Sequence, residues 1–401
     1  MEQPLISVIC ALYNGERYLD EFMASLLKQT YTNLEFILVD DYSSDQTHAR
    51  LVAYAKSDQR IRVFSMPYNS LTQARKLGFD QARGKYVSFV DCDDILERDM
   101  YQLLVENVLA AKAQVSIGSS FHFIGDQIVQ TMVQGQGLMP GKHLGANKRK
   151  VLTGFKAAQF HQGAIGAGIN PYTAVLWDKL FARDLIAACY QQYDFKLCMG
   201  EDVALCFSAL VKAQTVVVTP KVVYRLRLHQ KSTTQSVAYR QNLKIKRAYR
   251  YMKQCCQNTP CQAQLEAQLD YYFKYAIFTF NYRILERVRP LYPFNVKKGA
   301  RVLLYGAGLF GHKLFEYEQQ AEYVQVLGMV DKNKKVENTY TISDLKQLAY
   351  DYILVTIFND QLYPDILADL TQAGVDFQKI KFIKDPFWKD FTLDEILTDE
   401  D

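Results

Sequence analysis

Several features that mark membrane, disulfide-stabilised or nucleic-acid-binding proteins are weak or missing in this sequence of 401 residues. No segment approaches the roughly 20 apolar residues of a membrane span. The eight cysteines show no paired framework, so reduced thiols explain them better than disulfides. A net charge of +4 is too small to predict nucleic acid as a partner. The run Leu5 to Leu12 is too short for a signal peptide, so we expect a soluble, cytoplasmic protein.

The composition is that of a globular protein with more than one core. Hydrophobic residues make up 49% of the chain and charged residues 22%, which supplies a packed interior and a solvated surface. A chain of this length exceeds what one ordinary core accommodates. Two or three domains are therefore expected.

The first half alternates between strand-like and helix-like segments. Leu5 to Leu12 is a continuous apolar run, which is typical of a central parallel strand. The segments between the strands have apolar residues at helical spacing. This alternation with short turns predicts a parallel sheet wound by right-handed crossovers. The expected strands are residues 5–12, 34–39, 60–65 and 86–90, and the expected helices are residues 16–29, 46–56 and 72–82.

Polar side chains gather where three of these strands end. In such sheets, ligands bind outside the carboxyl ends of the strands. Packed carboxylates repel one another unless a positive group lies among them, and a divalent cation bound to diphosphate oxygens would meet that need. Ordinary turn chemistry or a helix N-cap would explain each position separately, and both remain open. The residues are Tyr13 and Asn14 after the first strand, Asp40 and Asp41 after the second, and Asp91, Asp93 and Asp94 after the fourth.

Three segments, taken together, resemble the family 2 inverting glycosyltransferases with the GT-A fold. They are residues 8–14 (Val-Ile-Cys-Ala-Leu-Tyr-Asn), residues 36–45 (Phe-Ile-Leu-Val-Asp-Asp-Tyr-Ser-Ser-Asp), and residues 73–94, which run from Gln-Ala-Arg to Asp-Cys-Asp-Asp. The resemblance covers about residues 5–96, with the motifs in the family's order and at its separations. It implies an α/β protein whose main domain is a mostly parallel sheet of GT-A type.

The resemblance also implies residues that hold the sugar donor and a metal ion. A carboxylate can accept the imide N–H of uracil, and a tyrosine ring can stack on the base; Asp41 is the favoured base contact. The guanidinium of Arg75 suits a diphosphate or nucleotide contact, with a surface salt bridge as the alternative. Asp94 is expected to start a helix. The implied donor-binding residues are Ala11, Tyr13, Asp40, Asp41, Arg75 and Asp91, and the implied ligands of Mn²⁺ or Mg²⁺ are Asp93, Asp91 and His229.

Inverting transfer requires a base that deprotonates the acceptor hydroxyl. Glu201 and Asp202 open a segment with helical spacing and resemble the family's Glu-Asp motif, which supplies that base; we assign the role to Asp202. A helix N-cap is the alternative for this acidic pair. For Trp177, an aromatic platform under an acceptor sugar and core packing are both open. The stretch from Tyr224 to His229 is similar to a segment that closes over the donor in relatives.

The second half predicts a helical segment followed by a small nucleotide-type domain. Residues 241–292 are mostly helical by composition, basic at first and then strongly aromatic, which leaves an interfacial helix and an interdomain helix open. The strand at residues 301–305 leads into a glycine turn, a helix, a second strand and an acid, as in the dinucleotide fingerprint. A bound nucleotide and a structural or oligomerising role are both open. The candidate nucleotide residues are Gly306, Gly308, Gly311 and Asp331.

These features predict three parts: a GT-A glycosyltransferase domain at residues 1–235, a helical connecting segment at 236–297 and a Rossmann-like α/β domain at 298–401. The expected function is metal-dependent, inverting transfer of a sugar from a nucleoside-diphosphate sugar, by resemblance UDP-linked, to a hydroxyl of a glycan or lipid-linked acceptor in bacterial surface polysaccharide synthesis. The protein could also associate peripherally with the inner face of the membrane, and it could form a homo-oligomer. The alternative is a nucleotide-binding scaffold or sugar-nucleotide-processing protein that uses the C-terminal domain.

Overall fold

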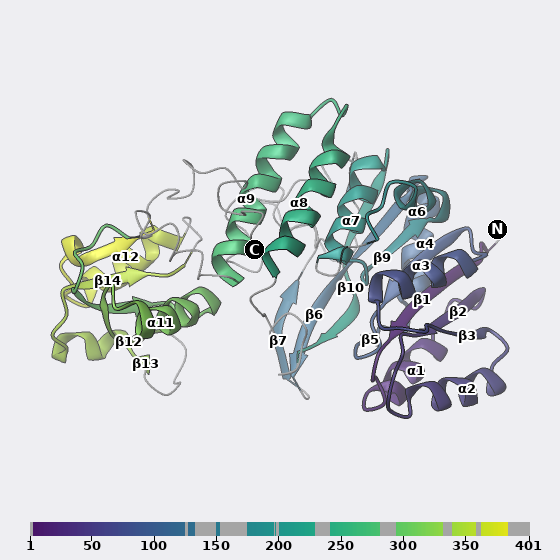
Figure 1. The fold of residues 1–401 in the computed structure, drawn as a ribbon, viewed down its shortest axis with the longest axis horizontal. Helices are drawn as coiled ribbons and strands as arrows, with labels where there is room; N and C mark the ends of the chain where they lie inside the picture. The colour runs from purple at the N-terminus through teal and green to yellow at the C-terminus, as the bar shows by residue number, and fades with distance from the viewer. Residues whose placement is uncertain are drawn as a thin grey trace. The chain divides into compact units, whose positions relative to one another are not determined.

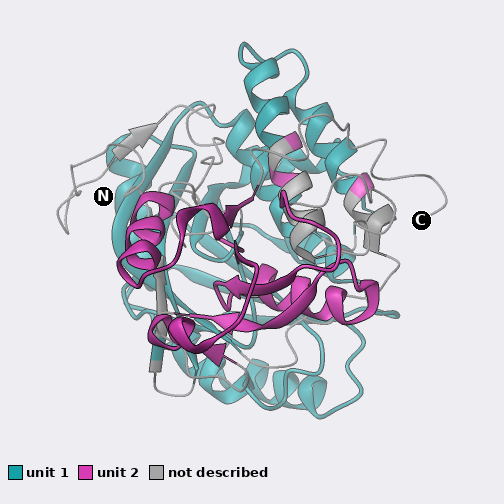
Figure 2. Ribbon diagram, turned by 90° about the vertical axis from the view of Figure 1, so that its left-hand side faces the viewer, with its two compact units in different colours: residues 1–161, 168–236, 247–269 teal, residues 162–167, 237–246, 270–401 magenta. Residues whose placement is uncertain are grey.

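The computed structural model describes residues 3–124, 127–132, 150–152, 175–195, 197, 200–228, 241–280, 294–331, 339–357 and 362–383. The chain divides into two compact units, which Figure 2 colours teal and magenta. The first comprises residues 1–161, 168–236 and 247–269, and the second comprises residues 162–167, 237–246 and 270–401. The domain boundaries expected at residues 235 and 297 stay a prediction.

A mixed sheet forms the centre of the first unit (Figure 1). Its described strands follow the order β3-β2-β1-β4-β9-β6-β10-β5, with β7 paired to β6 and β8 paired to β10. The strands β3, β2, β1 and β4 are parallel, and β9 runs antiparallel between β4 and β6. The bounds are β1 (Ile6–Leu12), β2 (Leu34–Asp40), β3 (Ile61–Ser65), β4 (Tyr86–Val90), β5 (Ile95–Leu96), β6 (Val115–Ile124), β7 (Gln127–Met132), β8 (Lys150–Leu152), β9 (Lys179–Ala182) and β10 (Val216–Arg227).

The register of the parallel strands places their carboxyl ends at one edge. Cys10 of β1 pairs with Leu38 of β2 and with Val90 of β4, so the residues that follow these strands lie at the same edge. Every residue of β1, β2 and β4 is buried, as their nearly continuous apolar sequences require of central strands. The predicted strands and the predicted parallel arrangement are confirmed, and so is the fold class.

Helices pack on this sheet and continue beyond it. Each has enough apolar residues on one side to cover part of the sheet or a neighbouring helix. None of the described helices combines the length and the apolar content that crossing a bilayer requires. The bounds are α1 (Leu19–Leu27), α2 (Thr47–Ser57), α3 (Leu71–Gln81), α4 (Met100–Ala111), α6 (Arg183–Tyr190), α7 (Glu201–Lys212), α8 (Gln241–Cys256) and α9 (Gln262–Phe280); α8 and α9 lie in the expected helical segment.

The second unit contains a parallel sheet of its own. Its described strands have the order β13-β12-β11-β14-β15, which is 3-2-1-4-5 when they are counted along this unit. Among the described residues, that is the order of the first five strands of a doubly wound, Rossmann-like sheet. The bounds are β11 (Arg301–Tyr305), β12 (Gln325–Val330), β13 (Thr339–Tyr340), β14 (Tyr352–Val355), β15 (Ile380–Phe382), α11 (Leu309–Ala321), α12 (Tyr363–Gln372) and the 3-10 helices η3 (Ile342–Gln347) and η5 (Phe377–Lys379).

Candidate active site

A buried arginine joins two acidic segments that are far apart in the sequence. Arg75 lies in α3 with only 8% of its surface exposed. Its Nη2 lies 3.0 Å from Oδ1 of Asp91, which follows β4, and its Nη1 lies 3.0 Å from Oε1 of Glu201, which begins α7. The surface salt bridge considered for Arg75 is therefore wrong. The arginine instead brings the end of β4 and the start of α7 to one place.

The charges at this place are strongly coupled. Burial opposes the charge of Arg75, but Asp91 and Glu201 outweigh that effect and raise the pKa of the guanidinium. Burial raises the pKa of Asp91, although the attraction of Arg75 opposes the rise. Removing a carboxylate would leave the buried guanidinium of Arg75 short of a partner, and removing Arg75 would leave the largely buried Glu201 without one; such changes are destabilising.

Asp202 has the ionisation expected of a general base. Burial, with a contribution from the neighbouring Glu201, raises its pKa to about 7, while Arg75 acts in the opposite direction. The N-cap position of α7 belongs to Gly200, whose φ of +67° is a left-handed conformation that glycine adopts readily. Glu201 and Asp202 are thus the first helical residues, and an N-cap does not explain the pair.

The loop after β4 differs from the prediction at Asp94. This residue does not start a helix, because β5 follows it and α4 begins only at Met100. Its side chain turns inward, with 3% exposed, and its Oδ1 accepts the backbone N–H of Arg227 at 2.7 Å. The Tyr224 hydroxyl also donates to it. These two bonds hold a buried carboxylate, and burial raises its pKa.

The end of β10 fastens the loop that carries the predicted metal ligands. Nε of Arg227 donates to the carbonyl oxygen of Asp93 at 2.9 Å, and the guanidinium pairs with Glu21. The Tyr224 hydroxyl accepts the backbone N–H of Asp91 at 3.1 Å. The sequence pointed to this stretch only as a segment near the donor. Its bonds to the loop after β4 went unrecognised, because strand β10 is separated from that loop by more than a hundred residues.

Trp177 lies inside the protein rather than on a binding surface. Only 5% of it is exposed, and its ring stacks on that of Tyr224 with centroids 4.7 Å apart. The acceptor platform is therefore wrong, and core packing, the other explanation, applies. Tyr224 is hydrogen-bonded to the loop after β4, so the stacking of Trp177 on Tyr224 helps to position that loop.

The predicted base-binding residues lie at the ends of β1 and β2. Ala11 is buried, whereas the ring of Tyr13 is 53% exposed. Asp40 accepts the backbone N–H of Ser43 at 3.3 Å, and Asp41 accepts that of Ser70 at 2.7 Å. Burial raises the pKa of Asp41. Both aspartates are buried and organise the turns around them, and their contact with a base stays a prediction.

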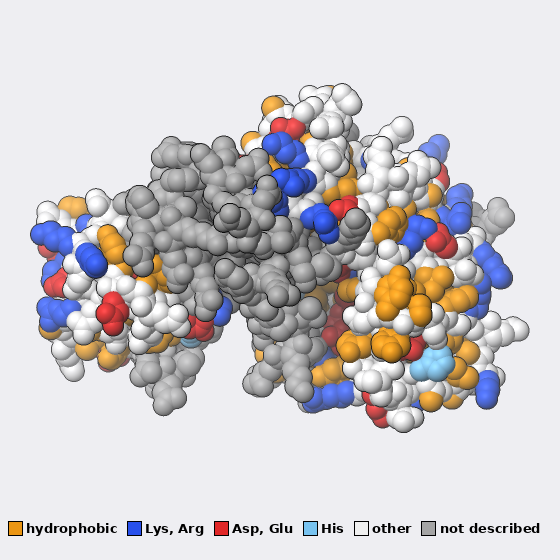
Figure 3. Space-filling model, viewed as in Figure 1, with side chains coloured by type: hydrophobic (Ala, Val, Ile, Leu, Met, Phe, Trp, Pro, Cys, Tyr) orange, Lys and Arg blue, Asp and Glu red, His pale blue; other side chains and the backbone are white. Residues whose placement is uncertain are grey.

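Two exposed tyrosines accompany Tyr13 and were not singled out from the sequence. Tyr42 follows Asp41 directly, and Tyr68 lies in the turn before α3; both rings are more than half exposed. Tyr42 has a φ of +67°, which is uncommon for a bulky residue and marks a constrained turn. Figure 3 shows exposed hydrophobic side chains gathered on the visible face of the first unit. In the sequence, the only feature that could have pointed to Tyr42 is its position directly after Asp40 and Asp41.

The donor set at the end of β4 fits a divalent cation. Asp91 and Asp93 supply carboxylate oxygens two residues apart, and Mg²⁺ typically takes one or two carboxylates together with substrate phosphates. Within the described ranges, no three Asp, Glu, His or Cys side chains form a complete protein cage for a metal. His229, the third predicted ligand, lies outside the described residues.

In the second unit, the glycine turn after β11 is explained largely by packing. Gly306 has a φ of +108°, and a Cβ on Gly311 would lie 2.2 Å from the carbonyl oxygen of Gly306. By contrast, a Cβ on Gly308 would have no atom within 4 Å. Asp331 accepts the backbone N–H of Ala307 at 3.0 Å, so it braces the turn. Nucleotide binding here stays a prediction.

Comparison with known proteins bears on the first unit. Residues 7–163 match the family model described as glycosyl transferase family 2. The stretch of residues 7–163 is a glycosyl transferase family 2 domain. The match spans all three motif segments and the loop after β4, so the predicted family is confirmed for this domain.

Two relatives and one solved structure illustrate this similarity. An uncharacterized glycosyltransferase, EpsJ of Bacillus subtilis, is 31% identical over 232 residues, which are 58% of this chain and 63% of EpsJ. TuaG of the same organism, a putative teichuronic acid biosynthesis glycosyltransferase, is 38% identical over 105 residues, 26% of this chain and 42% of TuaG. The chain thus spans less than two thirds of either relative. Residues 1–349 of S. aureus TarS, in a crystal structure with UDP-GlcNAc, have a TM-score of 0.55 and 21% identity over 70% of this chain and 76% of that fragment, which shows a shared fold.

Proposed function

We propose that this family 2 protein transfers a sugar, with inversion, from a UDP-linked donor to a hydroxyl of a glycan or lipid-linked acceptor in bacterial surface polysaccharide synthesis. Support for the donor comes from the shared fold with TarS, whose crystal contains UDP-GlcNAc. Support for the polysaccharide context comes from TuaG, which is named for teichuronic acid biosynthesis. A lipid-linked acceptor would fit a cytoplasmic protein associated with the inner face of the membrane.

The observation that carries the proposal is the bridge made by Arg75. Its two bonds of 3.0 Å hold Asp91 and Glu201 together, so Asp202 lies beside the carboxylates at the end of β4. Asp91 contributes to the raised pKa of Asp202, which agrees with their proximity. This proximity supports the proposal, because a single displacement requires a base beside the residues that hold the diphosphate.

In the proposed reaction, Asp202 accepts the proton of the acceptor hydroxyl. A pKa of about 7 lets this carboxylate be ionised in a large fraction of molecules near neutral pH and still bind a proton strongly. The acceptor oxygen forms a bond to the anomeric carbon, and the bond from that carbon to the diphosphate breaks. Asp91 and Asp93 would hold a Mn²⁺ or Mg²⁺ ion, which when bound supplies Lewis-acid stabilisation of the departing diphosphate.

The test is a transfer assay with a panel of UDP-sugars and glycan acceptors, with Mn²⁺, Mg²⁺ or EDTA. We expect release of UDP with one of the sugars, loss of release in EDTA, and an inverted anomeric configuration in the product by NMR. Asp93→Ala and Asp202→Asn should each cause a large loss of transfer. Asp80→Asn is the matched control, because Asp80 pairs with Lys76 on an exposed side of α3.

Full transfer activity in both Asp93→Ala and Asp202→Asn would refute the site assignment. Binding of a UDP-sugar without any transfer to any acceptor would favour the scaffold alternative.

A further inference from the structure

The second unit contains a hollow that the proposed reaction does not use. It has a volume of about 1090 Å³ and is formed where three parallel strands begin. Residues 297–300 precede β11, residues 351–352 lead into β14, and residues 376–382 contain η5 and β15. The glycine turn follows the opposite, carboxyl end of β11. The hollow, here called the lysine pocket, is therefore separate from the predicted nucleotide turn.

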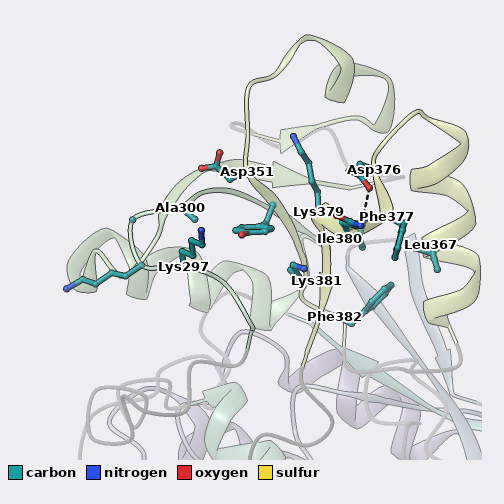
Figure 4. A pocket seen from close by; sticks show the side chains of 14 residues that line it. Lys297, Ala300, Asp351, Leu367, Asp376, Phe377, Lys379, Ile380, Lys381 and Phe382 are labelled. Atoms are coloured by element: carbon teal, nitrogen blue, oxygen red, sulfur yellow. Dashed lines mark hydrogen bonds between the residues drawn. The ribbon is translucent and has the colours of Figure 1, made fainter.

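Positive charge predominates in the lysine pocket. Four lysines line it; of these, Lys379 donates to the carbonyl oxygen of Tyr350 at 3.3 Å and acts electrostatically on the carboxylate of Asp351. Two aspartates also line it, but Asp351 is bound to Arg301 and Asp376 accepts the backbone N–H of Gln378 at 2.9 Å. Figure 4 shows lysines reaching the pocket from both the segment before β11 and the segment around β15. The lysines are Lys297, Lys298, Lys379 and Lys381.

Aromatic rings stand beside these lysines. Phe377 is 64% exposed, so most of its ring is open to solvent. Tyr352 and Phe382 also line the pocket, and the ammonium of Lys381 lies 5.3 Å from the centroid of the Tyr352 ring. The exposed ring of Phe377 offers an apolar face to sugar C–H groups, whereas ammonium groups bind phosphate or carboxylate.

We propose that the lysine pocket binds an anionic saccharide, meaning a sugar chain that carries carboxylate or phosphate groups. Its lining comes from three separate segments of the unit, which suits a discrete chain that contacts all three, and its volume is about that of an ordinary ligand site. Rings and lysines together match a ligand with both apolar and anionic faces. The binding itself is independent of the proposed transfer; only the role of the saccharide as acceptor or product rests on that function.

The test measures binding of labelled hexagalacturonate to the full-length protein by fluorescence anisotropy. Lys297→Gln/Lys381→Gln should weaken binding about tenfold, since two contacts between exposed opposite charges are lost. Binding should also weaken as salt is raised. Lys313→Gln/Lys346→Gln is the matched control, because it removes the same charge from the same unit outside the pocket. Phe377→Ala should weaken binding of the saccharide while leaving all four lysines in place.

Competition and vesicle-binding experiments distinguish an anionic saccharide from a neutral saccharide, free phosphate and an anionic lipid surface. Neutral maltohexaose should not compete, and inorganic phosphate should compete only weakly. Equal loss in the pocket and control variants would overturn the proposal, because binding would then follow overall charge. Pocket-dependent binding of phosphatidylglycerol vesicles in place of the saccharide would also overturn it. UDP release is measured on the same variants and should be unchanged, so failure of this proposal is distinguishable from failure of the proposed function.

Discussion

The substitution Asp202→Asn removes the proposed base while preserving the shape of the side chain. In the folded protein the pKa of Asp202 is raised to about 7 from an ordinary value of 3.8, chiefly by burial. The wild-type carboxylate must be ionised to accept a proton, so activity should rise with pH and approach a plateau above about 7. The amide cannot act as a base, and transfer should fall by about 10²- to 10⁴-fold.

The same substitution should change how stability depends on pH. Between pH 3.8 and about 7 the folded protein binds a proton at Asp202 that the unfolded chain has released, so the wild-type free energy of unfolding falls as pH rises. The difference between these pKa values corresponds to about 4 kcal/mol. An asparagine does not titrate. The variant should therefore gain stability relative to the wild type on going from about pH 5 to about pH 8.

Two assays check this reasoning. The rate of UDP release is measured against pH for the wild type, Asp202→Asn and the control Asp80→Asn, and urea unfolding of all three is followed at both pH values. The control should match the wild type in each assay. An acidic limb that persists in the residual activity of Asp202→Asn, or a stability difference that does not change with pH, would refute the role and the raised pKa given to Asp202.

Three further substitutions probe the supports of the site. Arg75→Gln removes a positive neighbour that lowers the pKa of Asp202, so the acidic limb of the pH–rate profile should move to higher pH. Thermal unfolding should show that the free energy of unfolding falls by about 3–5 kcal/mol. An acidic limb that does not move would contradict the bridge made by Arg75. Tyr224→Phe leaves the backbone N–H after β4 without its acceptor and should cost about 1–3 kcal/mol in urea unfolding, with weaker donor binding in calorimetry; unchanged values would contradict the contact. Gly118→Ala places a Cβ 2.2 Å from a valine of β10 and should lower the free energy of unfolding by about 1–3 kcal/mol. Gly308→Ala has open space around the new Cβ and should leave stability unchanged. Equal effects of the two substitutions on unfolding would contradict the close packing at Gly118.

Much of the first unit could be predicted because its sequence patterns are local. The apolar run at residues 5–12 became β1 at Ile6–Leu12, and the run at residues 86–90 became β4 with the same bounds. Buried parallel strands need apolar residues on both faces, so a continuous apolar run in the sequence predicts such a strand directly. The order of strands and helices then fixed which strand ends share an edge. The acidic character of that edge followed without knowledge of any contact.

The contacts that complete the site could not be predicted in this way. Asp94 has the sequence context of a turn or helix start, but a backbone N–H 133 residues away makes it a buried acceptor. Trp177 could equally have been exposed or buried, and its stacking on Tyr224 decided the matter. Such pairings depend on how strands β9 and β10 are placed beside β4 and β5. Local spacing carries no information about that placement.

The sequence by itself determined the fold class, the family of the N-terminal domain and the residue types at the strand ends, because strand periodicity and motif order are properties of short segments. Only the tertiary structure showed that Arg75 holds Asp91 and Glu201 at once, and that burial among these charges raises the pKa of Asp202 to about 7. It also brought lysines some 80 residues apart into one pocket in the second unit. Charge coupling and burial depend on distances through space, and folding alone sets those distances.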